Sequence, residues 1–304
     1  MAGETRRSTP EFVLVSGGAG GMGSATARRF AEDGAKVAIT DIDADRLKAM
    51  ADEIGALALP ADGTNCDELA AVVERTVAEF GGLDTLVATQ GVFSTGPAGR
   101  RGDDAWFRAL DVNLTGCYFL ATEAVRHLAE RKGSIVMIAS TVGLFGGPLG
   151  AVGYTASKSG LVGLVRWLAR EYGPRGVRAN AVCPGWVRTA LGGGAMAFLA
   201  EREGITPDEA YRLTTAHTPL RRPAEPAEIA SVCAFLASGD ASMVTGQALA
   251  VDGGGSAVDL ATAAFDPPAR DDVTRSSSAS GAPGLPVAAM LRLRMFGPRA
   301  ANGG

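Results

Sequence analysis

Histidine and paired cysteine are scarce in this chain of 304 residues, which holds two histidines and four cysteines. His127 and His217 are too few for a three-histidine site, and the cysteines form no Cys-x-x-Cys pair, so we expect no metal site. Every cysteine lies in an apolar stretch, which predicts buried, free thiols. The four are Cys66, Cys117, Cys183 and Cys233.

Long apolar runs and an excess of positive charge are missing as well. No stretch of about 18 apolar residues occurs, so nothing is predicted to span a membrane. The first residues are polar and lack the apolar stretch of a signal peptide, so we expect a cytoplasmic protein. The net charge is −4, which gives no reason to expect nucleic acid or an anionic membrane as a partner.

What the chain does have is a regular alternation of short apolar runs and longer helical patterns. Continuous apolar strands separated by helices are typical of a parallel sheet covered on both faces, and right-handed crossovers then give a doubly wound, Rossmann-type α/β fold. We expect seven strands, over residues 12–15, 36–40, 56–60, 83–88, 135–139, 178–182 and 248–251. We expect helices over residues 24–33, 45–54, 67–80, 104–130 (open to a break), 155–172 and 226–237.

Composition divides the chain into three parts. Residues 1–10 are predicted to be a flexible N-terminus, and residues 11–257 a single Rossmann-type domain. Residues 258–304 are rich in Pro, Ala, Ser, Gly and Arg, which predicts an extension that is largely disordered. Within it, residues 287–296 have the pattern of a short helix.

A glycine-rich loop joins the first strand to the first helix, over residues 16–23. Glycine lets the backbone turn sharply and approach a pyrophosphate without a Cβ clash, and the helix N-terminus offers N–H groups to the anion. A flexible turn would show the same cluster, but the place between a strand and a helix near the chain start favours a dinucleotide site. The expected contacts are Gly17, Gly20, Gly21, Met22 and Gly23.

Asp41 ends the second strand about 20 residues after the glycines, where a dinucleotide fold presents an acid to the adenosine ribose. A carboxylate there accepts the ribose hydroxyls of NAD and repels the 2′-phosphate of NADP. No Arg or Lys stands at positions 17, 18 or 42, so we expect NAD, with Ile42 beside it. Asp62 and Gly63 follow the third strand, where Asp62 either reaches the adenine amino group or forms a turn.

Tyr154 and Lys158 are spaced i, i+4 at the start of a helix, so their side chains point the same way. A free tyrosine has a pKa of about 10, too high for a base near neutrality, and an adjacent ammonium lowers that pKa. Tyr154 would then take the proton of an alcohol or give one to a ketone. Ser140 closes the fifth strand at the carboxyl edge of the sheet and either holds the substrate oxygen or is an ordinary turn residue.

Together these residues resemble the short-chain dehydrogenase/reductase family, over about residues 11–257. The glycine loop is similar to that family's Thr-Gly-x-x-x-Gly-x-Gly. The resemblance implies an NAD-dependent alcohol dehydrogenase or ketone reductase without a metal. The implied catalytic residues are Asn113, which would support a proton-relay water, and Ser140, Tyr154 and Lys158. Further implied cofactor contacts are Gly91, Tyr154, Lys158, Pro184, Gly185, Val187 and Thr189, the last two on the nicotinamide carboxamide.

The chain departs from the family pattern in three places. Ser16 replaces a threonine and keeps the hydroxyl. Residues 88–91, Ala-Thr-Gln-Gly, stand where Asn-Asn-Ala-Gly is typical, so we expect Thr89 or Gln90 to take over the asparagine hydrogen bonds. Ser140 and Tyr154 are one position further apart than is usual, which predicts that one residue loops out near the substrate pocket.

Residues 190–218 are predicted to cover the substrate pocket as a lid. Arg202 and Arg212 could hold an anion there, although a solvated arginine is the more common outcome. The apolar residues of this region predict an apolar, cyclic or aryl-alkyl alcohol or ketone as the substrate. They are Met196, Phe198, Leu199, Tyr211 and Leu213, with Leu144, Phe145 and Trp186 as further wall.

The helix over residues 155–172 is apolar around more than one face, so we expect it to pack against another subunit in a homotetramer, with a dimer as the second choice. Two rival functions stay open at this stage. One is an NADP-dependent 3-oxoacyl or carbonyl reductase of the same fold. The other is a nucleotide-binding protein without catalysis.

Overall fold

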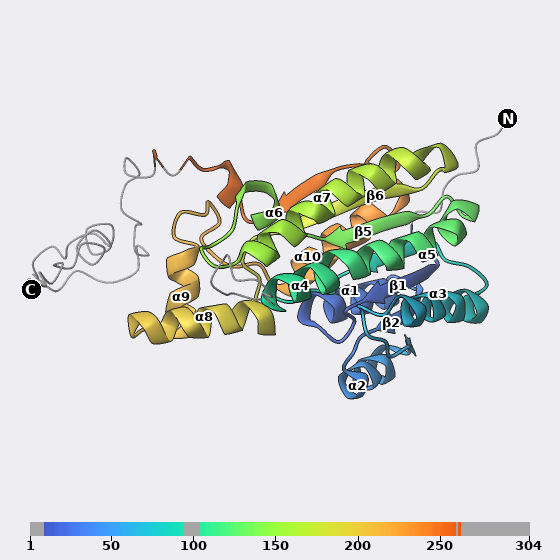
Figure 1. The fold of residues 1–304 in the computed structure, drawn as a ribbon, viewed down its shortest axis with the longest axis horizontal. Helices are drawn as coiled ribbons and strands as arrows, with labels where there is room; N and C mark the ends of the chain where they lie inside the picture. The colour runs from blue at the N-terminus through green and yellow to red at the C-terminus, as the bar shows by residue number, and fades with distance from the viewer. Residues whose placement is uncertain (1–8, 94–103, 260, 263–304) are drawn as a thin grey trace, which may run out of the picture. The chain divides into compact units, whose positions relative to one another are not determined.

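The computed structural model describes residues 9–93, 104–259, 261 and 262, all of which belong to one unit. The described residues form one parallel seven-stranded sheet in the order β3-β2-β1-β4-β5-β6-β7 (Figure 1). The order reverses between β1 and β4, the point where ligands bind in sheets of this kind. The strands are β1 (Phe12–Ser16), β2 (Lys36–Thr40), β3 (Leu57–Ala58), β4 (Thr85–Ala88), β5 (Ser134–Ile138), β6 (Arg178–Pro184) and β7 (Ala248–Val251).

Helices cover both faces of the sheet, as Figure 1 shows. The side chain of Leu14 packs in one core with α3, α5 and α7, whereas Val13 and Val15 pack in the other with α1, α2 and α10. This alternation follows from the period of two along a strand. The helices are α1 (Gly21–Glu32), α2 (Ala44–Ile54), α3 (Cys66–Phe80), α4 (Asp104–Leu110), α5 (Gly116–Glu130), α6 (Val142–Phe145), α7 (Val152–Tyr172), α8 (Ala190–Glu203), α9 (Pro207–Thr214) and α10 (Pro226–Ala237).

Local sequence fixes where these helices begin and end. Asn65 accepts hydrogen bonds from the N–H groups of Asp67 and Glu68, which caps the start of α3. Gly81 ends the same helix with φ of 84°, a conformation that glycine adopts without strain. A Thr206–Glu209 capping box starts α9. These caps fix where α3 begins and ends and where α9 begins.

The expected doubly wound fold is confirmed, with differences of detail. The third strand is only two residues long, Leu57–Ala58. The helix expected over residues 104–130 is interrupted by a π-helical segment, Asp111–Thr115. The prediction that every cysteine is buried is wrong for Cys66, which is exposed in the first turn of α3. The short helix expected over residues 287–296 and most of the predicted extension lie outside the described residues.

Within the part of the chain that the structure describes, no helix combines the length and apolar character needed to cross a bilayer.

Candidate active site

The glycine loop is packed so tightly that it has no room for a side chain at Gly17 or Gly23. Gly17 has φ of +69°, and a Cβ there would lie 2.7 Å from Thr89 Oγ1. A Cβ on Gly23 would lie 2.0 Å from the carbonyl oxygen of Gly17. Helix α1 begins at Gly21 with Gly20 as its N-cap and no side-chain cap, so its first N–H groups are left to an anion.

Asp41 lies directly beside this loop. Its Oδ2 accepts the N–H of Ala19 at 3.1 Å, and its Oδ1 accepts the N–H of Asp43 at 3.1 Å. These two bonds orient the carboxylate, and each oxygen keeps a further lone pair for a ribose hydroxyl. Arg46, which the sequence analysis did not single out, donates from Nη2 to the carbonyl oxygen of Ala19 at 2.7 Å. Arg46 and Asp41 therefore both bind the backbone of Ala19, one at its carbonyl oxygen and the other at its N–H group.

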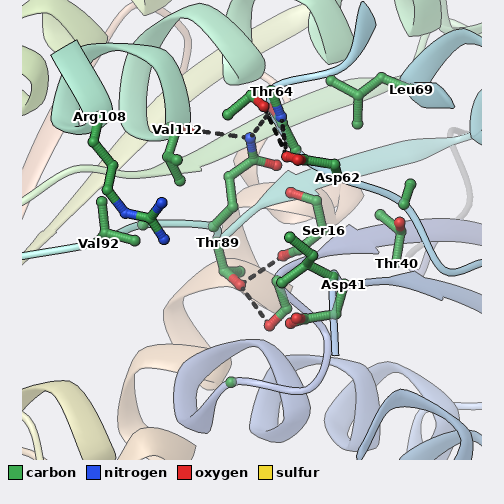
Figure 2. Close-up of a pocket in the computed structure, with 17 residues that line it drawn as sticks. Ser16, Thr40, Asp41, Asp62, Thr64, Leu69, Thr89, Val92, Arg108 and Val112 are labelled. Carbon is green, nitrogen blue, oxygen red and sulfur yellow. Dashed lines mark hydrogen bonds between the residues drawn. The ribbon is translucent and has the colours of Figure 1, made fainter. Parts of the chain in front are cut away.

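A cavity of about 250 Å³ opens at the carboxyl ends of β1, β2 and β4 and of the segment after β3. Figure 2 shows Asp41 on one side of it and Arg108 and Val112, from one helical segment, on another. Its lining includes the expected cofactor residues Gly17, Gly20, Asp41, Ile42, Asp62, Gly63 and Gly91. Gly21, Met22 and Gly23 are not part of the lining.

The cavity fits the adenosine half of a nicotinamide dinucleotide. The hydroxyls of Ser16 and Thr40 are buried in its wall and have no hydrogen-bond partner among the described residues. Buried polar atoms are rarely left unpaired, so these two point to a polar ligand. The cradle of glycines before α1 and the carboxylate of Asp41 supply the complementary chemistry for a pyrophosphate and a ribose.

The altered segment after β4 forms new hydrogen bonds within the site. Thr89 Oγ1 donates to the carbonyl oxygen of Ser16 at 2.6 Å and so ties β4 to the glycine loop. Gln90 Nε2 donates to the carbonyl oxygens of Gly63 at 3.3 Å and Val112 at 3.1 Å. Both side chains therefore anchor the segment, in the positions where we expected a substitute for asparagine.

Tyr154 lies in the first turns of α7, with its ring edge-to-face against Phe93 at a centroid distance of 5.0 Å. Burial raises the pKa of Tyr154, and its hydrogen bond with the Ser140 hydroxyl lowers that pKa in part. The expected net lowering of the Tyr154 pKa is therefore not found for the protein groups alone, because burial disfavours the phenolate and outweighs the lowering. Ser140 also accepts the N–H of Val142 at 3.2 Å, which fixes its hydroxyl at the end of β5.

Lys158 is buried one turn further along α7. Its Nζ donates to the carbonyl oxygen of Ile138 at 2.8 Å and lies 5.7 Å from the centre of the Tyr154 ring. Burial lowers the pKa of Lys158 to about 8, so the ammonium form still prevails at neutral pH. The nearby thiol of Cys183 has a pKa raised to about 11 by burial and stays neutral.

A pH series with Lys158→Met tests this buried charge. The pKa of Lys158 falls from 10.5 to about 8 on folding, so between those values the unfolded chain binds more protons. The lysine therefore destabilises the fold fully below pH 8, and the penalty disappears as the pH rises towards 10.5. Relative to Lys158→Met, the free energy of unfolding of the natural chain should rise by about 2 kcal/mol from about pH 7 to about pH 10 in urea titrations. A difference that does not change with pH would contradict a charged, buried Lys158.

Asn113 sits in the π-helical segment between α4 and α5, a feature that often marks functional sites. Its Oδ1 accepts the N–H of Val92 at 2.7 Å, while its Nδ2 donates to the Val92 carbonyl at 2.9 Å and to Ser157 Oγ at 3.0 Å. A Cβ added to Gly91 would lie 3.3 Å from Lys158 Nζ and 3.5 Å from Asn113 Oδ1. The structure thus brings Asn113, Gly91 and Lys158 together.

The segment after β6 approaches the start of α1. A Cβ on Gly21 would lie 2.9 Å from Thr189 Cγ2, so the segment expected to bind nicotinamide packs on the helix expected to bind pyrophosphate. Thr189 Oγ1 accepts the N–H of Gly192 at 3.1 Å as the N-cap of α8. The Val187 carbonyl accepts the Tyr211 hydroxyl at 3.3 Å. Before them, Pro184 ends β6 and Gly185 packs on Asp252.

The expected lid consists of α8 and α9, which pack on each other. Met196 and Tyr211 are buried in this small core, with Leu199 against it, so these three do not face a substrate. Phe198 is 67% exposed and Phe145, on α6, is 68% exposed. Residues 145–150 are exposed. Arg202 pairs with Glu203 and Arg212 with Glu209.

Three neighbours of the site were not predicted from the sequence: Phe93, Ser157 and Arg46. Phe93 follows β4 at the carboxyl edge of the sheet, so its place in the chain was a usable signal. Ser157 precedes Lys158, and nothing in the sequence shows that its hydroxyl faces Asn113 across two helices. Arg46 lies five residues after Asp41, and only the fold of α2 brings its guanidinium back to the glycine loop.

Comparison with known proteins agrees with this geometry. The family model described as enoyl-(acyl carrier protein) reductase matches residues 17–256. The chain is 40% identical to protein MoaE of Klebsiella aerogenes over 233 residues, which cover 76% of this chain and 90% of that protein. It is 39% identical to cis-4-hydroxycyclohexanecarboxylate dehydrogenase of Sinomonas cyclohexanicum over 236 residues, 76% of this chain and 90% of that protein.

Solved structures give the same result. Levodione reductase superposes with a TM-score of 0.77 at 32% identity, over 82% of this chain and 98% of that chain. An actinorhodin polyketide ketoreductase with NADPH superposes with a TM-score of 0.75 at 32% identity, over 80% of this chain and 96% of that chain. The chain belongs to the short-chain dehydrogenase/reductase family, oxidoreductases that bind a nicotinamide cofactor and act on small molecules.

Proposed function

We propose that this protein is an NAD-dependent dehydrogenase or reductase that interconverts a secondary alcohol and a ketone, with Tyr154 as the general acid and base. The observation that carries the proposal is the position of Tyr154, whose hydroxyl interacts with that of Ser140 and whose ring centre lies 5.7 Å from the buried ammonium of Lys158. A hydroxyl pair of this kind binds one oxygen of a substrate from two sides. The rest of the dinucleotide site adjoins it through Gly91.

The protein groups have separate tasks in this proposal. When bound, the nicotinamide exchanges a hydride with the carbon that carries the substrate oxygen. Tyr154 takes the hydroxyl proton of an alcohol, or gives its own proton to a ketone oxygen. Ser140 donates a hydrogen bond to that oxygen and stabilises the charge that develops on it. The ammonium of Lys158 favours the phenolate of Tyr154 through charge, and Asn113 holds the Val92 backbone that borders both groups.

Asp41 supports NAD over NADP. Its carboxylate is oriented by Ala19 and Asp43 beside the glycine loop, where a ribose 2′-phosphate would meet like charge. Like charges placed together cost several kcal/mol. Ile42, 71% exposed at the rim of the cavity, offers no charge to a phosphate.

The rival function, an NADP-dependent 3-oxoacyl or carbonyl reductase, has one observation in its favour. Arg46 and Asp41 both contact the backbone of Ala19, and the Arg46 side chain is 62% exposed. The actinorhodin polyketide ketoreductase whose structure resembles this one was crystallised with NADPH. Arg46 already donates to the Ala19 carbonyl and lies 3.9 Å from Asp43, so we favour NAD. A non-catalytic nucleotide-binding protein is less favoured because it has no use for the Tyr154–Ser140 pair.

An apolar ring-bearing substrate fits the surroundings of Tyr154. Phe93 packs its ring against Tyr154, and Phe145, Phe198 and Trp186 keep exposed aromatic surface around the expected pocket. Aromatic rings bury large apolar area and favour edge-to-face and stacked contacts with other rings. The relative from Sinomonas is named for a substituted cyclohexanol, which supports a cyclic secondary alcohol here.

The proposal is tested by incubating the purified protein with NAD and a panel of cyclic and aryl-alkyl secondary alcohols, with sugars and 3-hydroxyacyl thioesters as comparison substrates. We expect NADH to form with the ring-bearing alcohols and much less with sugars. Turnover restricted to acyl thioesters with NADP would support the rival reductase. An inert protein that binds NADH tightly would support the non-catalytic alternative.

We further propose a homotetramer, with a dimer as the second choice. Trp167 on α7 is 45% exposed and Tyr118 on α5 is 42% exposed, so each helix keeps apolar surface beyond what its own sheet covers. Association buries such surface. Sedimentation velocity of the full chain measures the oligomeric state, and a monomer at micromolar concentration would contradict the proposal.

We also propose that residues 11–257 form one domain and that residues 258–304 form an extension to it.

A further inference from the structure

Gln90 holds a fixed orientation in the cavity wall. Its Nε2 donates to the carbonyl oxygens of Gly63 and Val112. Both partners are acceptors only, so the amide must turn its NH₂ towards them, which uses both of its hydrogens. The other end of the planar amide, Oε1, is then left as an acceptor. No donor among residues 9–93 and 104–259 bonds to it.

The neighbouring glycines make room for this one side chain. A Cβ on Gly116 would lie 1.9 Å from the Gly63 carbonyl oxygen and 2.6 Å from Gln90 Nε2. A Cβ on Gly63 would lie 3.1 Å from the same nitrogen. Gln90 is therefore wedged between the loop after β3 and the helical segment that carries Val112, and its amide cannot swing away from the cavity without losing both bonds.

Asp62 is a second acceptor in the same cavity (Figure 2). Its Oδ1 accepts the N–H of Thr64 at 2.9 Å and the Thr64 hydroxyl at 2.8 Å, which leaves Oδ2 for another donor. The backbone bond from Thr64 is the main cause that lowers the pKa of Asp62, and the charge of Arg108 adds to it. The carboxylate thus stays ionised at neutral pH and can only accept.

Two acceptors in one cavity suit a ligand group that donates two hydrogens. The catalytic groups Tyr154 and Lys158 are not among the residues that line this cavity, so it holds the other end of a dinucleotide, its purine end. An adenine presents an exocyclic amine with two N–H donors, whereas hypoxanthine presents a carbonyl oxygen at the same carbon. The hypoxanthine carbonyl oxygen can accept no hydrogen bond from Gln90 Oε1 or Asp62 Oδ2, because both are acceptors. It also gives up the hydrogen bonds that it made to water, so its binding is weakened.

We propose that Gln90, with Asp62, selects adenine over an oxygen-bearing purine in the dinucleotide that binds here. This inference rests on the proposed function only in taking the ligand to be a nicotinamide dinucleotide, and it holds equally for NAD and NADP, which share the base. It assigns to Gln90 a role that an alanine at this position could not fill.

The test uses Gln90→Leu, which keeps the volume and removes the acceptor. The full-length protein and the variant are titrated with NADH and with reduced nicotinamide hypoxanthine dinucleotide, followed by nicotinamide fluorescence. The natural chain should bind NADH about tenfold more tightly than the hypoxanthine analogue, the size of one to two hydrogen bonds. In Gln90→Leu that preference should fall about fivefold.

The preference between the two dinucleotides is the decisive quantity, because Gln90→Leu also loses its bonds to Gly63 and Val112 and could weaken both ligands alike. Gln247→Leu makes the same chemical change at an exposed side chain directly before β7, outside the lining of the cavity, and should leave both affinities unchanged. Equal weakening of both dinucleotides in Gln90→Leu would overturn the inference, as would equal affinities in the natural chain, a result that needs no variant. Binding of neither dinucleotide by the natural chain would instead overturn the proposed function itself.

Discussion

Tyr154→Phe should lower kcat about 10³-fold, because the variant keeps the ring and loses the hydroxyl that moves the proton. The Kd for NADH should stay within about twofold of the natural value, since the loss of one hydroxyl is small beside the contacts of the whole dinucleotide. Steady-state kinetics with the best alcohol of the panel, together with a fluorescence titration of NADH, measure the two quantities.

The matched control is Tyr118→Phe, which removes a tyrosine hydroxyl from an exposed position on α5. It should leave kcat and Kd unchanged. A Tyr154→Phe variant with nearly full activity would show that another group exchanges the proton. Loss of NADH binding in that variant would show that the tyrosine serves the cofactor rather than the chemistry.

The double variant Asp41→Ala with Ile42→Arg should abolish the preference for NADH. It removes the carboxylate that would repel a 2′-phosphate and adds a guanidinium that pairs with one. The ratio of the Kd for NADPH to the Kd for NADH should fall by about 100-fold or more, since opposing like charges cost several kcal/mol. Fluorescence titrations with both reduced cofactors measure the ratio.

Arg46→Ala separates the two possible roles of the neighbouring cation. If Arg46 only holds the Ala19 carbonyl, the variant weakens both cofactors by a similar small factor. A selective loss of NADPH affinity would show that Arg46 binds the phosphate, which favours the rival reductase. For the Asp41→Ala, Ile42→Arg double variant, an unchanged ratio of the Kd for NADPH to the Kd for NADH would contradict the role of Asp41.

The fold and the order of the site along the chain could be predicted because each depends on local patterns. Strand β1 and the glycine loop after it are set by an apolar run followed by residues that alone tolerate the backbone of Gly17 and the contact at Gly23. The spacing of Tyr154 and Lys158 on α7 follows from helix geometry. These local patterns can be interpreted from the sequence without knowing which residues pack against them.

What could not be predicted depends on contacts between distant segments. The raised pKa of Tyr154 comes from its burial, which the spacing to Lys158 does not reveal. The role of Gln90 depends on two carbonyls from other loops. Whether Met196 and Tyr211 face a substrate or each other is likewise decided by how α8 and α9 pack, which the sequence pattern does not show.

The most direct test of the central claim, that this is an NAD-linked dehydrogenase site, is a fluorescence titration of the natural protein with NADH and with NADPH. We predict saturable binding of NADH at least about 100-fold tighter than that of NADPH, because of the charge on Asp41. Tighter binding of NADPH would contradict the NAD assignment, and binding of neither would contradict the dinucleotide site.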